Sequence, residues 1–255
     1  MGCGYRGFLL ILFYQLGSSA TKYRKKDKQK IDAEAAEGSI RGPEQVLACS
    51  FLATLLSCLH AYSIGEEQII NFNSGNPLAS RLACAVISHH ACCCADTLAS
   101  ELGILVKSNP FLITKPWKKV PPGTNGGVTY VGFIWSAIGG ALIGMGAFVC
   151  DAFTTGFNFG HYQSEKYFLL NVIFGALTGL IGSVLDSILG ATVQASYFDP
   201  DKKLMYCGKR EGRSMPKNLD VVCGFDVLTN AQVNFVSILL CTYISAYCIG
   251  PHIYR

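Results

Sequence analysis

An uncharged stretch at residues 128–150 decides the fold, and it reads VTYVGFIWSAIGGALIGMGAFVC. A helix needs about 20 predominantly apolar residues to cross the hydrocarbon core of a bilayer. A charged side chain at the bilayer centre is costly, so a stretch of this length without Asp, Glu, Lys or Arg is typical of a membrane span. Residues 128–150 are therefore predicted to form a transmembrane helix.

Comparable apolar stretches recur on both sides of this one. They are residues 46–64, 78–95, 168–185 and 233–250, with a weaker stretch at 5–20. Arg81 interrupts the stretch at 78–95, and Arg6 weakens the one at 5–20. Together with residues 128–150, the pattern predicts five spans and, from the weaker stretch, a sixth at the N-terminus.

The composition agrees with a chain whose main solvent is lipid. Of the 255 residues, 50% are hydrophobic and only 15% are Asp, Glu, Lys or Arg. Soluble domains carry about 25% charged residues, and a chain of this size exposes too much surface to hide the deficit. A soluble enzyme and a disordered chain are therefore excluded. The predicted fold class is all-α, a polytopic membrane helical bundle of about six spans.

The basic residues predict the orientation of the bundle. Most of the 21 Lys and Arg residues fall within segments 22–41, 107–119 and 202–217. With six spans these three segments lie on one side, and an excess of Lys and Arg marks the cytosolic side. The run at 22–30 is interpreted as a stop-transfer charge cluster that could also touch anionic lipid.

The chain divides into three parts on this pattern. Residues 1–44 hold the weak first span and a basic cytosolic loop, 45–77 the second span and a lumenal loop, and 78–255 a membrane domain of two repeats. The repeats show as Asp96-Thr97-Leu98 and Asp186-Ser187-Ile188, and as Thr124-Asn125 and Thr229-Asn230, which open the spans that follow. Because each unit has two spans, the copies run parallel and bring both Asp residues to the same face.

Asp186 follows an apolar helix, and an acidic residue in that position is a functional candidate. Asp96 and Glu101 form a similar group, with Ser100 and Thr97 on the same helical stripes. Carboxylates on one face suit Mg²⁺, so Asp96, Glu101 and Asp186 are predicted as metal ligands and catalytic residues around one cleft. The alternative is that Asp186 is solvated at the interface and ends its helix.

A glycine-rich loop precedes the span at 128–150. It contains Gly123, Thr124, Asn125, Gly126 and Gly127, with Lys118 and Lys119 before it. Backbone N–H groups at a helix start bind anions, so the loop is a candidate phosphate site, although a tight turn at the membrane explains it as well. Lys209 and Asn230 in the second repeat are predicted to join it. Carboxylates and cations together point to phosphoryl transfer.

Three motifs resemble the transmembrane protein 19 family. They are Ala95-Asp96-Thr97-Leu98-Ala99-Ser100-Glu101-Leu102-Gly103, Val120-Pro121-Pro122-Gly123-Thr124-Asn125-Gly126-Gly127-Val128-Thr129 and Gly182-Ser183-Val184-Leu185-Asp186-Ser187-Ile188-Leu189-Gly190-Ala191-Thr192-Val193-Gln194. The resemblance runs from about Gly7 to the C-terminus. The chain departs from the family at Leu98, where Trp is more usual.

The resemblance implies a kinase of isoprenoid phosphates. The family includes the plant phytyl-phosphate kinase of the chloroplast envelope, which converts a prenyl monophosphate to the diphosphate. It implies a nucleoside triphosphate as donor, the bilayer and an isoprenoid phosphate as partners, and no nucleic acid. A plant member would lie in the chloroplast envelope and an animal member in endomembranes. The alternatives are a non-catalytic transporter or scaffold, or a shortened, inactive family member.

Overall fold

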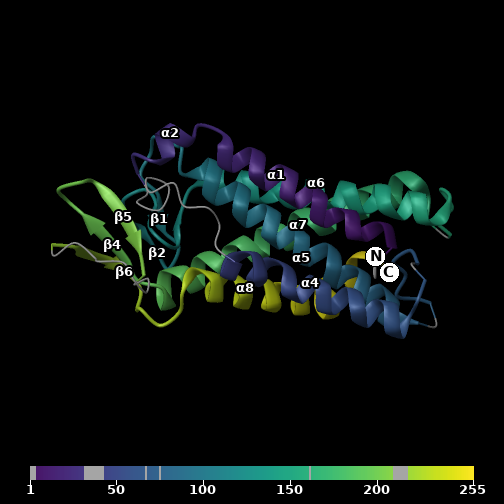
Figure 1. Cartoon of the computed structure of the whole chain (residues 1–255). Helices are drawn as coiled ribbons and strands as arrows, with labels where there is room; N and C mark the ends of the chain where they lie inside the picture. Colours follow the sequence, from purple (N-terminus) through teal and green to yellow (C-terminus); the bar gives the residue numbers. More distant parts are fainter. Residues whose placement is uncertain (1–3, 32–42, 67, 75, 161, 209–217) are drawn as a thin grey trace.

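The computed structural model describes residues 4–31, 43–66, 68–74, 76–160, 162–208 and 218–255. The chain forms a long bundle of helices with small β-sheets at one end (Figure 1). The first described residues and the C-terminus lie together at the opposite end (Figure 1). The described parts of the three basic segments lie at the sheet end, as their predicted common side requires.

Five helices of the described chain are long and apolar enough to cross a membrane. They are α4 (Pro43–Ser63), α5 (Pro77–Gly103), α6 (Tyr130–Thr155), α7 (Ser164–Val193) and α8 (Asn230–Ile244), the last continued by η2 (Ser245–Ile249) and α9 (Gly250–Ile253). The predicted polytopic helical bundle is confirmed. Helix α5 is the central helix, because 83% of its apolar window is buried against 22% for α4.

The weak N-terminal stretch forms η1 (Gly4–Phe8) and α1 (Leu9–Lys22), which pack on α5 and α6. Arg6 does not face lipid, because its Nε lies 2.8 Å from Asp151 Oδ1 and both side chains are buried. Tyr167 donates a hydrogen bond of 2.6 Å to the other oxygen of Asp151. The charge that interrupts this stretch is thus paired inside the bundle. Short helix α2 (Lys25–Lys28) follows.

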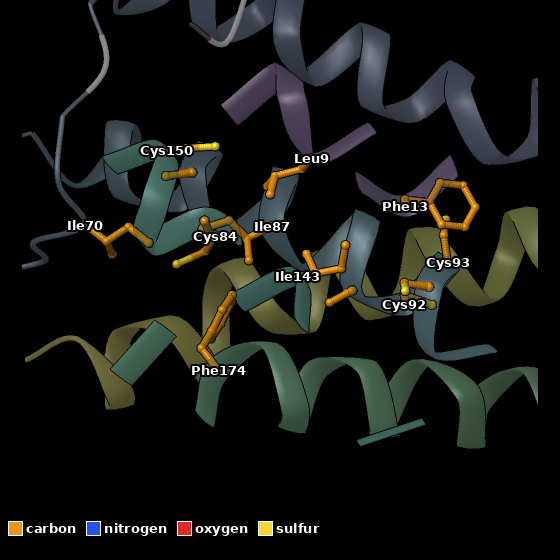
Figure 2. Close-up of a cluster of buried hydrophobic side chains, with 14 of the residues drawn as sticks. Leu9, Phe13, Ile70, Cys84, Ile87, Cys92, Cys93, Ile143, Cys150 and Phe174 are labelled. Carbon is orange, nitrogen blue, oxygen red and sulfur yellow. The ribbon is translucent and has the colours of Figure 1, made fainter. Parts of the chain in front are cut away.

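Buried apolar side chains of α1, α5, α6 and α7 form the core of the bundle. Figure 2 shows Phe13 of α1, Ile87 of α5, Ile143 of α6 and Phe174 of α7 in this cluster. Helices α6 and α7 also approach closely at glycines, since a Cβ on Gly140 would collide with the backbone oxygen of Gly175. Small residues allow such contacts between membrane helices.

The two repeats have the same architecture. The first runs from α5 through β1 (Phe111–Leu112), β2 (Lys115–Lys119) and β3 (Gly127–Val128) to α6. The second runs from α7 through β4 (Ser196–Asp199), β5 (Leu204–Cys207) and β6 (Asp220–Cys223) to α8. Their three-stranded antiparallel sheets have the orders β2-β1-β3 and β5-β4-β6, with the first strand central in each. This shared topology supports the duplication, although the sequence had predicted only basic loops here.

Candidate functional site

A cleft of about 430 Å³ lies where the bundle meets the sheets. Both repeats line it, and most of the predicted site residues are present: Asp96, Glu101, Gly123, Thr124, Asn125, Gly126, Gly127, Asp186 and Asn230. The parallel repeats thus bring Asp96 and Asp186 together, as predicted from their matching places in the sequence. The roles of these residues stay predictions.

Asp96 and Asp186 occupy equivalent places in the two repeats. Each lies about two helical turns before the end of its helix, α5 for Asp96 and α7 for Asp186. Each is half-buried. Asp186 Oδ1 accepts a hydrogen bond of 2.9 Å from Ser237 Oγ of α8. This bond orients one carboxylate oxygen and connects α7 to α8 beside the cleft.

Glu101 is already engaged within the protein. Its Oε2 lies 2.6 Å from Lys28 Nζ, and its Oε1 accepts a 2.7 Å bond from Thr21 Oγ1. Lys28 is only 4% exposed and also donates to Ala20 O at 2.6 Å. Sequence reasoning missed Lys28 and Thr21, because 73 residues separate Lys28 from Glu101 and no local pattern joins them.

The carboxylates do not form a ready-made metal cage. Among the residues that the structure describes, no three His, Cys, Asp or Glu side chains are close enough to hold one ion. Glu101 is moreover bound to Lys28. Mg²⁺ commonly takes one or two protein carboxylates and completes its shell with water and substrate phosphates. The predicted set of three carboxylates is therefore not present as one metal site, and a role of Asp96 and Asp186 in binding Mg²⁺ stays a prediction.

The glycine-rich loop packs against the second repeat. Asn125 N donates to Ser196 Oγ of β4 at 3.0 Å, and Cys223 Sγ of β6 donates to Asn125 O at 3.3 Å. Gly126 has a φ of +68°, and a Cβ there would collide with Ser187 O and Ala191 Cβ of α7. The loop of one repeat therefore forms a cleft wall on the other.

The loop does not open a helix, contrary to the prediction. Helix α6 begins at Tyr130, and Thr129 caps it by accepting a 3.0 Å bond from Gly132 N. The prediction was wrong because β3 lies between the loop and the helix. In the second repeat Thr229 caps α8 with a capping box, so its counterpart is Thr129 and not Thr124. Asn230 begins α8, whereas Asn125 lies in a turn.

One polar atom in the loop points to a ligand. Asn125 Nδ2 is buried and finds no hydrogen-bond partner within the described residues. A buried donor left without an acceptor costs about 1–3 kcal/mol, and an oxygen of a bound ligand would satisfy it. By contrast, the Thr124 hydroxyl is satisfied within the loop, where it donates to Pro121 O at 2.6 Å.

The predicted lysines lie elsewhere. Lys118 and Lys119 do not line the cleft, because β2 is the edge strand on the far side of β1 from β3. Lys118 Nζ instead donates to Val222 O at 3.0 Å. Lys209 lies outside the described residues. The described lysines that line the cleft are Lys25 and Lys28, which the sequence interpretation had assigned to a stop-transfer cluster.

Comparison with known proteins agrees with the membrane architecture. Residues 1–242 match the family described as integral membrane protein DUF92. Protein PGR of Arabidopsis thaliana is 35% identical over 95% of this chain and 81% of its own length. An uncharacterized membrane protein of Synechocystis sp. is 30% identical over 75% of this chain and 64% of its own length.

A more distant relative is Protein VTE6, chloroplastic, of Arabidopsis thaliana, which is 26% identical over 51% of this chain and 36% of its own length. No solved structure matches the chain. These matches confirm the family resemblance seen in the motifs. The chain belongs to the DUF92 family of integral membrane proteins.

Proposed function

We propose that this protein transfers a phosphoryl group from a nucleoside triphosphate to an isoprenoid monophosphate at the membrane surface. The observation that carries the proposal is that Asp96 and Asp186, which occupy equivalent places in the two repeats, line the same cleft as Asn125. The side-chain amide of Asn125 has a buried donor without a partner among the described residues. The family resemblance to a phytyl-phosphate kinase and the distant likeness to Protein VTE6 support the same class. The cleft volume lies within the range of small-molecule sites.

The chemistry of the acceptor explains what the carboxylates are for. A monophosphate is largely ionised at neutral pH, so its oxygen attacks the terminal phosphorus without a general base. A bond forms between the acceptor oxygen and the terminal phosphorus. The bond between that phosphorus and the bridging oxygen breaks, and the nucleoside diphosphate leaves with the electron pair. Catalysis then consists mainly of positioning and of neutralising phosphate charge.

Each side chain has a part in this proposal. Asp96 and Asp186 would hold Mg²⁺, which supplies positive charge to the phosphate oxygens. The Ser237 hydroxyl keeps Asp186 oriented, and Asn125 Nδ2 donates to a phosphate oxygen. Because the cleft lies at the sheet end of the bundle, a lipid headgroup enters from the membrane surface and the nucleotide from water.

Direct assay of purified protein tests the proposal. The full chain in lipid nanodiscs is incubated with Mg²⁺, a panel of prenyl monophosphates and nucleotides labelled on the terminal phosphate, and label is sought in the prenyl diphosphate. We expect transfer to at least one acceptor, loss of transfer on chelation of Mg²⁺, and loss in Asp186→Asn. The matched control is Asp201→Asn, an exposed carboxylate at the sheet end that does not line the cleft.

Two results would contradict the proposal. One is the absence of transfer by the well-folded wild-type protein with every acceptor and nucleotide. The other is undiminished turnover by a well-folded Asp186→Asn protein. Either result would favour the non-catalytic alternative, in which Asp186 serves to connect α7 and α8 through Ser237.

A further inference from the structure

The segment 21–31, here called the N-terminal arm, connects the two repeats beside the cleft. At its start Thr21 Oγ1 donates to Glu101 Oε1 of α5 at 2.7 Å, and Lys28 Nζ contacts Glu101 Oε2 at 2.6 Å. At its end Ile31 O accepts a 3.1 Å bond from Met205 N of β5. Helix α5 belongs to the first repeat and β5 to the second, so the arm is held by both (Figure 1).

The charged residues of the arm divide into those that line the cleft and those that do not. Asp27 pairs with Arg24 at 2.8 Å and with Lys30 at 3.6 Å, away from the cleft. The Arg24 guanidinium donates to Asp27 and lowers the pKa of that carboxyl, so Arg24 and Lys30 both face a carboxylate of the arm itself. Lys25 and Lys28 lie three residues apart, on one face of α2, and both line the cleft.

Lys25 and Lys28 differ in their partners. The charge of Lys28 is neutralised by Glu101, and its ammonium is further bound by Ala20 O. Lys25 is exposed and forms no ion pair with any residue that the structure describes. Its ammonium is therefore the arm's uncompensated positive charge on the cleft wall. A Lys ammonium presents three donors and is a common phosphate ligand.

We propose that Lys25 binds a phosphate group in the cleft and that Glu101, through Lys28, positions the arm that carries it. The inference rests on the proposed function for the source of the phosphate, which is either the nucleotide or the isoprenoid headgroup. It gives Glu101 a positioning role in place of the metal-binding role predicted from the sequence. It also gives the N-terminal basic run a place in the site.

Binding without turnover tests the role of Lys25. Equilibrium binding of inorganic pyrophosphate, a non-hydrolysable nucleoside triphosphate analogue and farnesyl monophosphate is measured on the full chain in nanodiscs. We expect Lys25→Ala to weaken pyrophosphate binding by about tenfold, as for loss of one charge-assisted hydrogen bond. Lys26→Ala is the matched control, since Lys26 is exposed on the same short helix and does not line the cleft.

The other two probes identify the source of the phosphate. If only the nucleotide analogue loses affinity in Lys25→Ala, Lys25 binds the donor; if only farnesyl monophosphate does, it binds the acceptor. Unchanged binding of all three probes, or no pyrophosphate binding by the wild type, would overturn the proposal. Binding through Lys25 without any phosphoryl transfer would contradict the proposed function alone. Transfer with Lys25→Ala unaffected would contradict the Lys25 site alone.

Whether Glu101→Gln strengthens or weakens pyrophosphate binding shows whether Glu101 acts through its charge alone or by positioning the arm. Removing a negative charge from a cleft should strengthen anion binding if Glu101 acts only through its field. If Glu101 positions the arm, Glu101→Gln leaves Lys28 buried without a counter-charge, the arm detaches, and pyrophosphate binding weakens. Faster tryptic cleavage within the arm should accompany the loss, with Glu165→Gln, at the other end of the bundle, as control. Stronger binding, or an arm as protected as in the wild type, would refute this role.

Discussion

At the scale of single residues, the site depends on side chains that partners on other elements hold in place, and in the case of Asn125 these partners belong to the other repeat. Asp186 is oriented by Ser237 of the next helix, and Asn125 is held by Ser196 and Cys223 of the second sheet. Neither relation follows from spacing along the chain. Residue-level tests therefore measure how the two repeats act on one ligand.

The equivalence of the two aspartates gives the first prediction. Asp96→Asn and Asp186→Asn each keep size and hydrogen bonding but remove a charge, so each should lower phosphoryl transfer by about 100-fold or more. Ser237→Ala removes the hydroxyl that is bonded to Asp186 but leaves the charge of the carboxylate in place, so its loss should be smaller. Turnover and detergent-extracted yield are measured on the same preparations. A large loss for one aspartate only would contradict shared use of the cleft by both repeats.

The second prediction concerns the glycine-rich loop. Gly126→Ala should lower the free energy of unfolding by about 1–3 kcal/mol beyond its backbone strain, because the added Cβ collides with α7. Gly65→Ala is the matched control: Gly65 has a φ of +80°, yet nothing lies within 4 Å of its added Cβ. Thermal unfolding in detergent compares the two. An equal decrease in the free energy of unfolding for both variants would show that α7 shifts to accommodate the added Cβ at little cost.

At the scale of elements, the N-terminal helix is fixed to the bundle by a polar network. Arg6 of η1 pairs with Asp151 of α6 and donates to Gln68 O at 2.7 Å. Tyr167 of α7 binds the same carboxylate and accepts a 3.1 Å bond from Ile70 N. Four separate segments, namely η1, residues 68–70, α6 and α7, thus meet around one buried ion pair, at the end opposite the cleft.

The third prediction follows from this buried pair. Arg6→Met leaves Asp151 charged and buried without its partner, which should destabilise the bundle by about 3–5 kcal/mol. The double variant Arg6→Met with Asp151→Leu removes both charges and should recover much of that loss. Thermal unfolding of both proteins in detergent measures the difference. A double variant no more stable than Arg6→Met would mean that the pair contributes by packing and not by charge.

At the scale of the whole molecule, both sheets, the arm and the cleft share one end of the bundle (Figure 1). The positive-inside rule predicts that this end faces the cytosol. This orientation can be tested by labelling cysteines introduced into the three basic segments. Positions 28, 112 and 205 are unsuitable, because Lys28, Leu112 and Met205 are buried and a cysteine there would not react with a thiol reagent in water. Exposed positions in the same segments are Lys26, Lys115 and Lys202.

The fourth prediction is the orientation. Single cysteines at positions 26, 115 and 202, in a cysteine-depleted chain, should all react with an impermeant maleimide from the cytosolic side. A cysteine in place of exposed Ser164 should react only from the other side. Labelling of sealed membrane vesicles of both orientations decides it. One of the three sheet-end positions reacting from the side of Ser164 would contradict the six-span arrangement.

The sequence by itself determined the membrane bundle, its duplication and the meeting of Asp96 with Asp186. These follow from local patterns, because lipid requires each span to satisfy its backbone within one apolar helix, and parallel repeats place equivalent residues at one end. The two small sheets could not be predicted from the sequence, because strands of two to five residues carry almost no periodic hydrophobic pattern.

Only the tertiary structure decided which cations reach the cleft and what Glu101 binds. The sequence placed Lys118 and Lys119 there because they precede the glycine-rich loop, yet the strand order carries them to an outer edge. Lys28 and Glu101 are 73 residues apart in the sequence. They meet because α1 packs against α5, which places the arm that follows α1 beside the C-terminal end of α5. Such a pairing depends on which helices pack together, and that is a property of the whole folded chain and not of any segment.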